Sequence, residues 1–257
     1  MFRALSPSLR GALIAVRWHM TLVEVIAGWQ QEALGIKPPL GTDRLPAVGG
    51  LSGPAFFPEG YGLSHPIRPE NARPTVMAIG HNFGCAAYRK EIGPAGREDD
   101  KATWRNLDAL LVKAGSSPEQ CFRTNCFIGL LPGDKQVGRF LLKPDPAYEQ
   151  ACRSLLIMQI GFLRPTALLL LGPEVAGRAY KIMPALEPWR GASTWAEIDC
   201  SSIGPYLRDV EVPHADLRTN VAALLHPSFG AANEGRRMKN MTVPMAEAEI
   251  IRSVLKG

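Results

Sequence analysis

Thr166-Ala-Leu-Leu-Leu-Leu-Gly172 is the stretch that decides the fold. Everything between its threonine and its glycine is apolar, so a strand formed here needs other elements on both of its faces. Sheets covered on both faces are built mainly from parallel strands with crossover helices between them. Pro173, which follows, suits the first turn of a short helix. The stretch therefore predicts a central strand of an α/β protein.

The segments on either side alternate between strand and helix patterns. We expect further strands at 75–79, 121–128 and 221–225, and helices at about 100–114, 146–162 and 245–255. Residues 189–211 are ambiguous between a strand and a hairpin. The alternation predicts a three-layer α/β/α sandwich whose central sheet has four strands and is mainly parallel.

Residues 1–73 are expected to form an extension packed on this domain, which itself spans 74–257. Within 9–34, apolar residues recur at helical spacing, and Gly35 offers a stop. From 36 to 73 the chain is rich in proline and glycine, which favours an extended wrap over a separate unit.

The composition, with 46% apolar and 21% charged residues, is that of an ordinary globular protein. The net charge of +5 is compatible with a polyanionic partner but does not require one. The five cysteines form no C-x-x-C pair, so a cytoplasmic protein with reduced thiols is expected. The longest strongly apolar stretch, 167–172, is far too short to cross a bilayer. We expect a monomer without a membrane partner.

Two polar loops each follow an apolar strand-like run. Gly80-His-Asn-Phe-Gly84 follows the run at 75–79, and His226-Pro-Ser-Phe-Gly230 follows the run at 221–225. Because α/β sheets place their ligand crevice at the carboxyl ends of parallel strands, the two loops are candidates for one site.

Asn82 and His226 are the candidate catalytic residues. Asn82 either caps its own turn or orients a water or a substrate carbonyl, and it cannot act as a base. Its neighbour His81 is either a second polar contact or a solvent-facing loop residue. His226 is either a structural hydrogen-bonding residue or a neutral imidazole that stabilises an oxygen as it becomes anionic.

Asn125 and the loop after Phe229 suggest recognition. A strand asparagine that is buried must be hydrogen-bonded, either to backbone or to a ligand such as the N3–H and O4 edge of a pyrimidine. Phe229 precedes three cations, which form either a solvated loop or a wedge with phosphate-binding side chains: Arg236, Arg237 and Lys239.

Several other chemistries lack their motifs. The sequence has no G-x-G-x-x-G, Walker loop or G-x-S-x-G elbow, and no histidine pair with zinc spacing. Carboxylates are scarce near the expected strand ends, which argues against metal-dependent phosphoryl transfer. We therefore expect neither a metal nor another cofactor.

Taken in order, these motifs resemble the uracil-DNA glycosylase superfamily over roughly residues 74–255. The Gly80–Gly84 loop resembles its first catalytic loop, and Asn82 stands where some families carry a water-activating aspartate and the mismatch-specific families carry asparagine. Thr124-Asn125 resembles the pair whose asparagine reads the uracil edge, and 166–172 resembles the central strand. His226-Pro-Ser resembles the second catalytic motif.

Two departures from the superfamily matter. Phe83 replaces the proline that usually follows the water-positioning residue. Cys152 lies where the iron–sulfur families have one of four cysteines, but Gly129 stands at another of these positions and no C-x-x-C precedes them, so no cluster is expected. Phe83 and Tyr88 are the candidates for the aromatic that stacks on the base.

The resemblance implies a monofunctional DNA glycosylase, a hydrolase of N-glycosyl bonds in base excision repair. It would flip uracil or a related deaminated base out of single- or double-stranded DNA. Asn125 would read the base, His226 would stabilise its anionic O2, and Asn82 would hold the attacking water. Further substrate contacts are expected from Gly80, His81, Phe83, Tyr88 and Ser228, and DNA contacts from Phe229, Arg236, Arg237 and Lys239.

Two alternatives stay open. The chain can be a nucleic-acid-binding protein that keeps the fold without turnover, or a small-molecule α/β protein that binds a nucleobase or nucleoside. Salt-sensitive DNA binding without product would indicate the first, and little DNA affinity would indicate the second.

Overall fold

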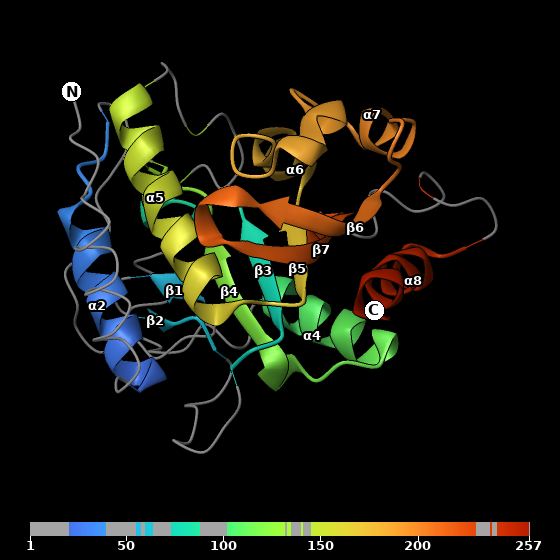
Figure 1. Cartoon of the computed structure of the whole chain (residues 1–257), viewed down its shortest axis with the longest axis horizontal. Coiled ribbons are helices and arrows are strands. Elements are labelled where there is room, and N and C mark those ends of the chain that lie inside the picture. Colours follow the sequence, from blue (N-terminus) through green and yellow to red (C-terminus); the bar gives the residue numbers. More distant parts are fainter. Residues whose placement is uncertain are drawn as a thin grey trace.

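A central sheet lies between two layers of helices (Figure 1). The computed structural model describes residues 21–39, 55–57, 60–63, 73–87, 102–131, 133–134, 140, 145–229, 237 and 241–256. Within these residues, no helix has the length and apolar character needed to cross a membrane.

The sheet has five strands in the order β4-β3-β5-β7-β6. The first four are parallel to one another, and β6 is antiparallel to β7. Their bounds are β3 (Val76–Gly80), β4 (Cys121–Asn125), β5 (Ala167–Leu171), β6 (Tyr206–Val212) and β7 (Leu217–Leu224). The apolar runs of β3 and β5 are buried along their whole length, as expected for strands covered on both faces.

The expected number of four strands is wrong, because the ambiguous region contains β6. This strand carries charged side chains and is interrupted between Leu207 and Val210, where the register with β7 shifts. Asp209 has a positive φ of 54° at this irregularity. Charges and bulges are how edge strands avoid pairing with other chains, and they also hide the alternation by which a strand is recognised in sequence.

Helices cover both faces of the sheet (Figure 1). On one face, α4 (Ala102–Ala114) packs against α8 (Val243–Leu255), and on the other lie α5 (Pro146–Leu163) and α6 (Pro173–Ala179). The described chain also has α7 (Trp195–Asp199) and short 3-10 helices: η2 (Pro118–Gln120), η3 (Pro184–Trp189), η4 (Pro213–Ala215) and η5 (Pro227–Phe229). The α/β class is thus confirmed.

Strand ends differ from the expectation where the backbone turns to bond a neighbouring loop. β4 ends at Asn125 rather than at 128, since the N–H groups of Cys126 and Phe127 donate to the carbonyls of Gly80 and His81. β7 starts at Leu217 rather than at 221, because it pairs there with β6. The expected helix ends at Ala114 and Phe162 hold to within a residue.

The described part of the N-terminal extension packs on the domain. α2 (Leu22–Gly35) starts with a capping box, in which Thr21 accepts from the Glu24 amide and the Glu24 side chain accepts from the Thr21 amide. Its Trp29 is 3% exposed and makes edge contacts with three phenylalanines: Phe56, Phe122 and Phe162. Phe56 belongs to a two-stranded sheet of β1 (Phe56–Phe57) and β2 (Gly60–Tyr61).

Replacing this tryptophan should destabilise the whole domain. Trp29→Ala removes a buried ring at the junction of α2, β1, β4 and α5, and we expect a loss of about 3–5 kcal/mol in the free energy of unfolding. Urea denaturation followed by circular dichroism measures it. The matched control is Val23→Ala on the same helix, where the side chain is 47% exposed. Equal small losses in both variants would show that α2 is not part of the folded core.

Candidate functional site

The carboxyl ends of the four parallel strands all carry polar residues. His81 and Asn82 follow β3, Asn125 ends β4, Glu174 follows β5, and His226 follows β7. Parallel strands bring these ends to one edge of the sheet, where α/β proteins bind their ligands. The two loops singled out in the sequence therefore lie on the same edge.

The β3–β4 pair fixes the first part of the site. Gly80 is in register with Asn125, and the Cys126 amide donates to the Gly80 carbonyl at 2.8 Å. A Cβ atom on Gly80 would stand 2.4 Å from Oδ1 of Asn125, closer than side chains come. Gly80 therefore supports the site by leaving room for the Asn125 carboxamide.

Asn125 is nearly buried, and the described residues form no hydrogen bond with its carboxamide. The residue is 7% exposed, and no hydrogen bond of its carboxamide is found to the rest of the described chain. The neighbouring Thr124 differs, because its hydroxyl donates to Oε1 of Gln159 on α5 at 3.0 Å. The Asn125 carboxamide is not among the fully buried polar groups that lack a partner in the described chain, so it reaches solvent at the ligand edge of the sheet and is available to a ligand.

Asn82 caps its own turn. Its Nδ2 donates to the Gly84 carbonyl at 3.0 Å, and its Oδ1 lies 3.1 Å from Nδ1 of His81. This is the turn-forming role that asparagine has in many loops. Each end of the carboxamide keeps one further hydrogen-bonding position, because the amide has two hydrogens and the oxygen two lone pairs. Asn82 is thus oriented by the protein and can still hold a water.

Of the two interpretations of His81, the solvent-facing loop residue is wrong. Its side chain is 18% exposed and meets the rings of Phe127 and Phe140 edge-on, with centroids 5.2 and 6.0 Å away. Nε2 lies 3.3 Å from a carboxylate oxygen of Glu174. Burial lowers the pKa of His81, while Glu174 and the contact with Asn82 act in the opposite direction.

His226 lies in a turn that is held from two helices. The amide of Leu225, just before it, donates to Oε2 of Glu247 on α8 at 2.9 Å, and Asn106 on α4 donates to the Pro227 carbonyl at 2.8 Å. The half-buried imidazole has Nδ1 2.7 Å from Oγ of Ser228. Burial, with a smaller contribution from a charge on His81, lowers the pKa of His226 to about 4.

Asn125, His226 and the two loops lie at the same carboxyl edge of the sheet. β4 and β7 are three strand steps apart in the sheet order, so Asn125 and His226 are separated by about 14 Å of backbone. The influence of His81 on the pKa of His226 shows that the first and second loops are electrostatically close.

Arg237 corrects the prediction of a phosphate-binding cation. Its side chain is 2% exposed and pairs with Glu247 at 2.6 Å and Asp199 at 3.2 Å. It also donates to the Ala223 carbonyl and covers the ring of Trp195. Burial raises the pKa of Glu247, and Arg237 opposes that shift. Arg237 therefore anchors the β7 end to α7 and α8.

The remaining predicted contacts have different outcomes. Phe83 is described and is only 9% exposed. Tyr88, Arg236 and Lys239 lie outside the described residues, and the Phe229 side chain is not described. Their predicted roles in stacking, phosphate binding and helix penetration stay predictions.

Glu174 was missed, and it corrects the statement that carboxylates are scarce near the strand ends. It lies in the first turn of α6, directly beyond the end of β5. The available signal was its place two residues after the apolar run 167–172. Within the described residues, no group of three metal-ligating side chains occurs.

A separate pocket lies between α5 and α6. It encloses about 540 Å³ of empty space, part of it open solvent, and neither Asn82, Asn125 nor His226 lines it. Of the charged residues on its rim, Glu149 pairs with Lys181 at 2.8 Å and with Arg178 at 3.7 Å. The polar edge described above is therefore not this pocket.

Comparison with models of known protein families and with curated proteins finds no match to this chain. The resemblance to the uracil-DNA glycosylases accordingly rests on the motifs themselves.

Removing the buried guanidinium should be costly. Arg237→Ala leaves the carboxylates of Glu247 and Asp199 without their cation, and we expect the free energy of unfolding to fall by about 3–5 kcal/mol. Urea denaturation gives the value. The control is Arg190→Ala, whose partner pair with Glu187 is exposed and whose loss should be close to zero. If Arg237→Ala were as stable as the unchanged protein, the guanidinium would not be needed for folding and would be available for another role.

His226 should make stability depend on pH. In the folded protein its pKa is about 4, below the ordinary 6.5, so the unfolded chain binds the proton first as pH falls. Its contribution is fully present above 6.5 and is lost as the pH falls towards 4. Denaturation of His226→Asn across this window should show a flatter dependence than the unchanged protein, while a variant of the exposed His214 should not. Parallel curves for His226→Asn and the unchanged protein would contradict the burial argument.

Proposed function

We propose that this edge of the sheet binds a pyrimidine base flipped out of DNA and hydrolyses its N-glycosidic bond. The bond between the base nitrogen and the sugar carbon breaks first, and its electron pair moves onto the base and its O2. A water then adds to the sugar carbon, which has oxocarbenium character, and its proton passes to the base anion, so that free base and an abasic sugar are formed. Uracil or a related deaminated base is the expected substrate.

The observation that carries this proposal is the carboxamide of Asn125, for which the described residues provide no hydrogen-bond partner. It offers one donor and one acceptor from a nearly buried position, which matches the O4 and N3–H of a uracil ring. Burial makes such a contact discriminating, because a base that lacks the matching groups leaves the amide unsatisfied.

His226 is suited to the departing base. If Oγ–H of Ser228 donates to Nδ1, the ring proton lies on Nε2, which can then donate to the anionic O2. The lowered pKa keeps the ring neutral at ordinary pH, so this stabilisation comes from a fixed N–H dipole. The role of Ser228 is therefore to fix which ring nitrogen of His226 carries the proton.

Asn82 limits the rate. It can hold a water through its free amide hydrogen or lone pair, but it cannot take a proton from it or balance the positive sugar. Losing one such electrostatic partner costs about 3 kcal/mol, or roughly a hundredfold in rate. We therefore expect weak uracil excision, or a preferred base other than uracil.

A second candidate is a small-molecule protein that binds a nucleobase or nucleoside at the same edge. The burial of Arg237 favours it, since that residue is no longer available as one of the three predicted phosphate contacts. Such a protein would bind a free base without salt-sensitive affinity for DNA.

The decisive test is release of free base from a panel of lesion-bearing oligonucleotides, single-stranded uracil DNA included, at excess protein. We expect slow release of uracil or a related base. In His226→Ala the rate should fall about 10²–10³-fold. The control is His214→Ala, an exposed histidine of η4 at the opposite end of β7, which should keep full activity.

Four outcomes separate the possibilities. No release of any base at excess protein would refute the enzyme, and salt-sensitive binding without release would leave a DNA-binding protein. Binding of free base alone would favour the second candidate. Full activity in His226→Ala would remove His226 from the mechanism.

A further inference from the structure

An imidazole joins a carboxylate to the carboxamide of the first loop. Nε2 of His81 lies 3.3 Å from Oε2 of Glu174, and Nδ1 of His81 lies 3.1 Å from Oδ1 of Asn82. α6 can begin beside the first loop because Gly172, just before its first residue, has a φ of 108°, which side chains rarely allow. Three residues from two segments, the first loop and α6, therefore form one polar chain.

The hydrogen bonds of Asn82 locate one proton of His81. A backbone carbonyl only accepts, so the atom of Asn82 that faces the Gly84 carbonyl is the Nδ2 amide, and Oδ1 faces His81. Oδ1 also only accepts, so Nδ1 of His81 donates. A neutral ring then has its lone pair on Nε2, and this lone pair points at a carboxylate oxygen that also only accepts.

A second proton resolves this conflict. Nε2 is buried and has no hydrogen-bond partner of ordinary geometry among the described residues. When it takes a proton from solvent, the imidazolium donates from both nitrogens, to Asn82 and to Glu174. The positive ring and the negative carboxylate then form a neutral pair, which suits a site where His81 is mostly buried.

The groups around His81 shift the pKa of its ring in opposite directions. Burial lowers the pKa of the ring most, Glu174 and Asn82 raise it, and Arg178, one turn further along α6, lowers it again. A charge on His81 also lowers the pKa of His226, so the two rings disfavour each other's protonation. Glu174 is the carboxylate among these groups, and its charge is the largest of the influences that favour the second proton.

We propose that Glu174 is a positioning residue: its carboxylate holds a proton on Nε2 of His81, and the imidazolium in turn holds the carboxamide of Asn82 in place for the attacking water. The catalytic part of this statement rests on the proposed function. Glu174 itself touches neither base nor water.

The proton is tested first, without any reference to activity. The titration of His81 is followed by NMR of its ring nitrogens in the whole protein and in Glu174→Gln. The glutamine amide can donate to a neutral Nε2, so the geometry is kept while the charge is lost. We expect the pKa of His81 to fall, because the carboxylate that raises it has lost its charge. An unchanged pKa would overturn the proposal.

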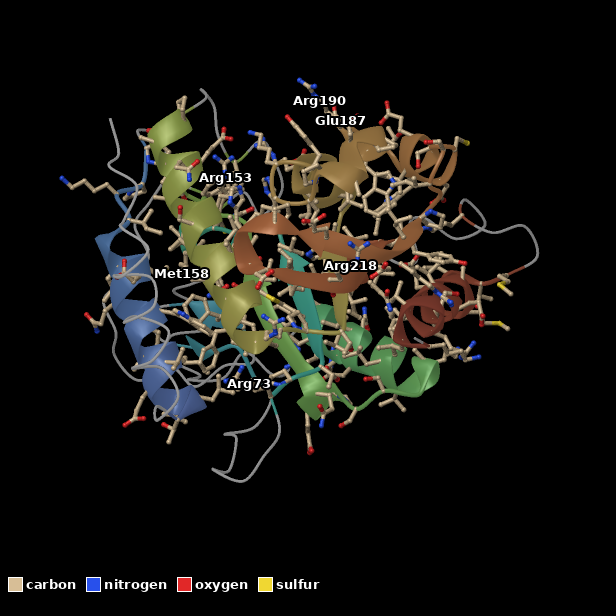
Figure 2. All side chains as sticks on the ribbon, viewed as in Figure 1. Arg73, Arg153, Met158, Glu187, Arg190 and Arg218 are labelled. Atoms are coloured by element: carbon tan, nitrogen blue, oxygen red, sulfur yellow. The ribbon has the colours of Figure 1, made fainter. Side chains whose placement is uncertain are left out.

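The matched control is Glu187→Gln. Glu187 pairs with Arg190 at 3.0 Å, and Figure 2 shows both at the surface beyond α6. This substitution also removes one carboxylate from an ion pair near α6, and it should leave the titration of His81 unchanged. An equal shift in both variants would mean that net charge, rather than the contact with Glu174, is being measured.

The pH profile of base release then tests the positioning role. The unchanged protein should lose activity as the pH rises through the pKa of His81, and Glu174→Gln should not, because its amide holds the neutral ring. Glu174→Ala should be slower by roughly tenfold. A profile that is identical in the unchanged protein and Glu174→Gln, despite a shifted pKa, would overturn the role. If no base is released at all, the proposed function fails, and the NMR titration still decides whether the pair exists.

Discussion

The site depends on a close approach of two parallel strands at their carboxyl ends. Gly80 and Asn125 are in register, and the carboxamide lies so near the glycine that a methyl group there would collide with it. The amides of Cys126 and Phe127 then bond the backbone of the first loop, which ends β4 and turns the chain away from the sheet. The position of the buried amide, and with it any recognition of a base, follows from a missing side chain.

Both sides of the site are supported by buried polar groups rather than by apolar packing alone. Gln159 bonds Thr124 beneath the first side, and Glu247 with Arg237 holds the strand end beneath the second. Burying such groups costs free energy unless every contact is made. A reaction needs its groups held to within a fraction of an ångström. The free-energy cost of unmade contacts helps here, because it disfavours every other arrangement of these buried groups.

Much of the fold could be predicted because buried parallel strands are continuous apolar runs, as in 75–79 and 166–171. β6 could not, because an edge strand with charges lacks that signal. Arg237 reads as a surface cation in sequence, since its partners Asp199 and Glu247 are 38 and 10 residues away and only the fold brings them together. Glu174 reads as an ordinary carboxylate in the first turn of a helix, where the helix dipole favours it. The nearby loop histidine gives it a second partner that no local pattern shows.

The most direct test of the account is a crystal structure of the protein soaked with free uracil. We expect the ring at the carboxyl edge of the sheet, with its O4 and N3–H on the Asn125 carboxamide and its O2 within hydrogen-bonding distance of Nε2 of His226. Uracil bound elsewhere, such as in the pocket between α5 and α6, with the Asn125 carboxamide untouched, would contradict it.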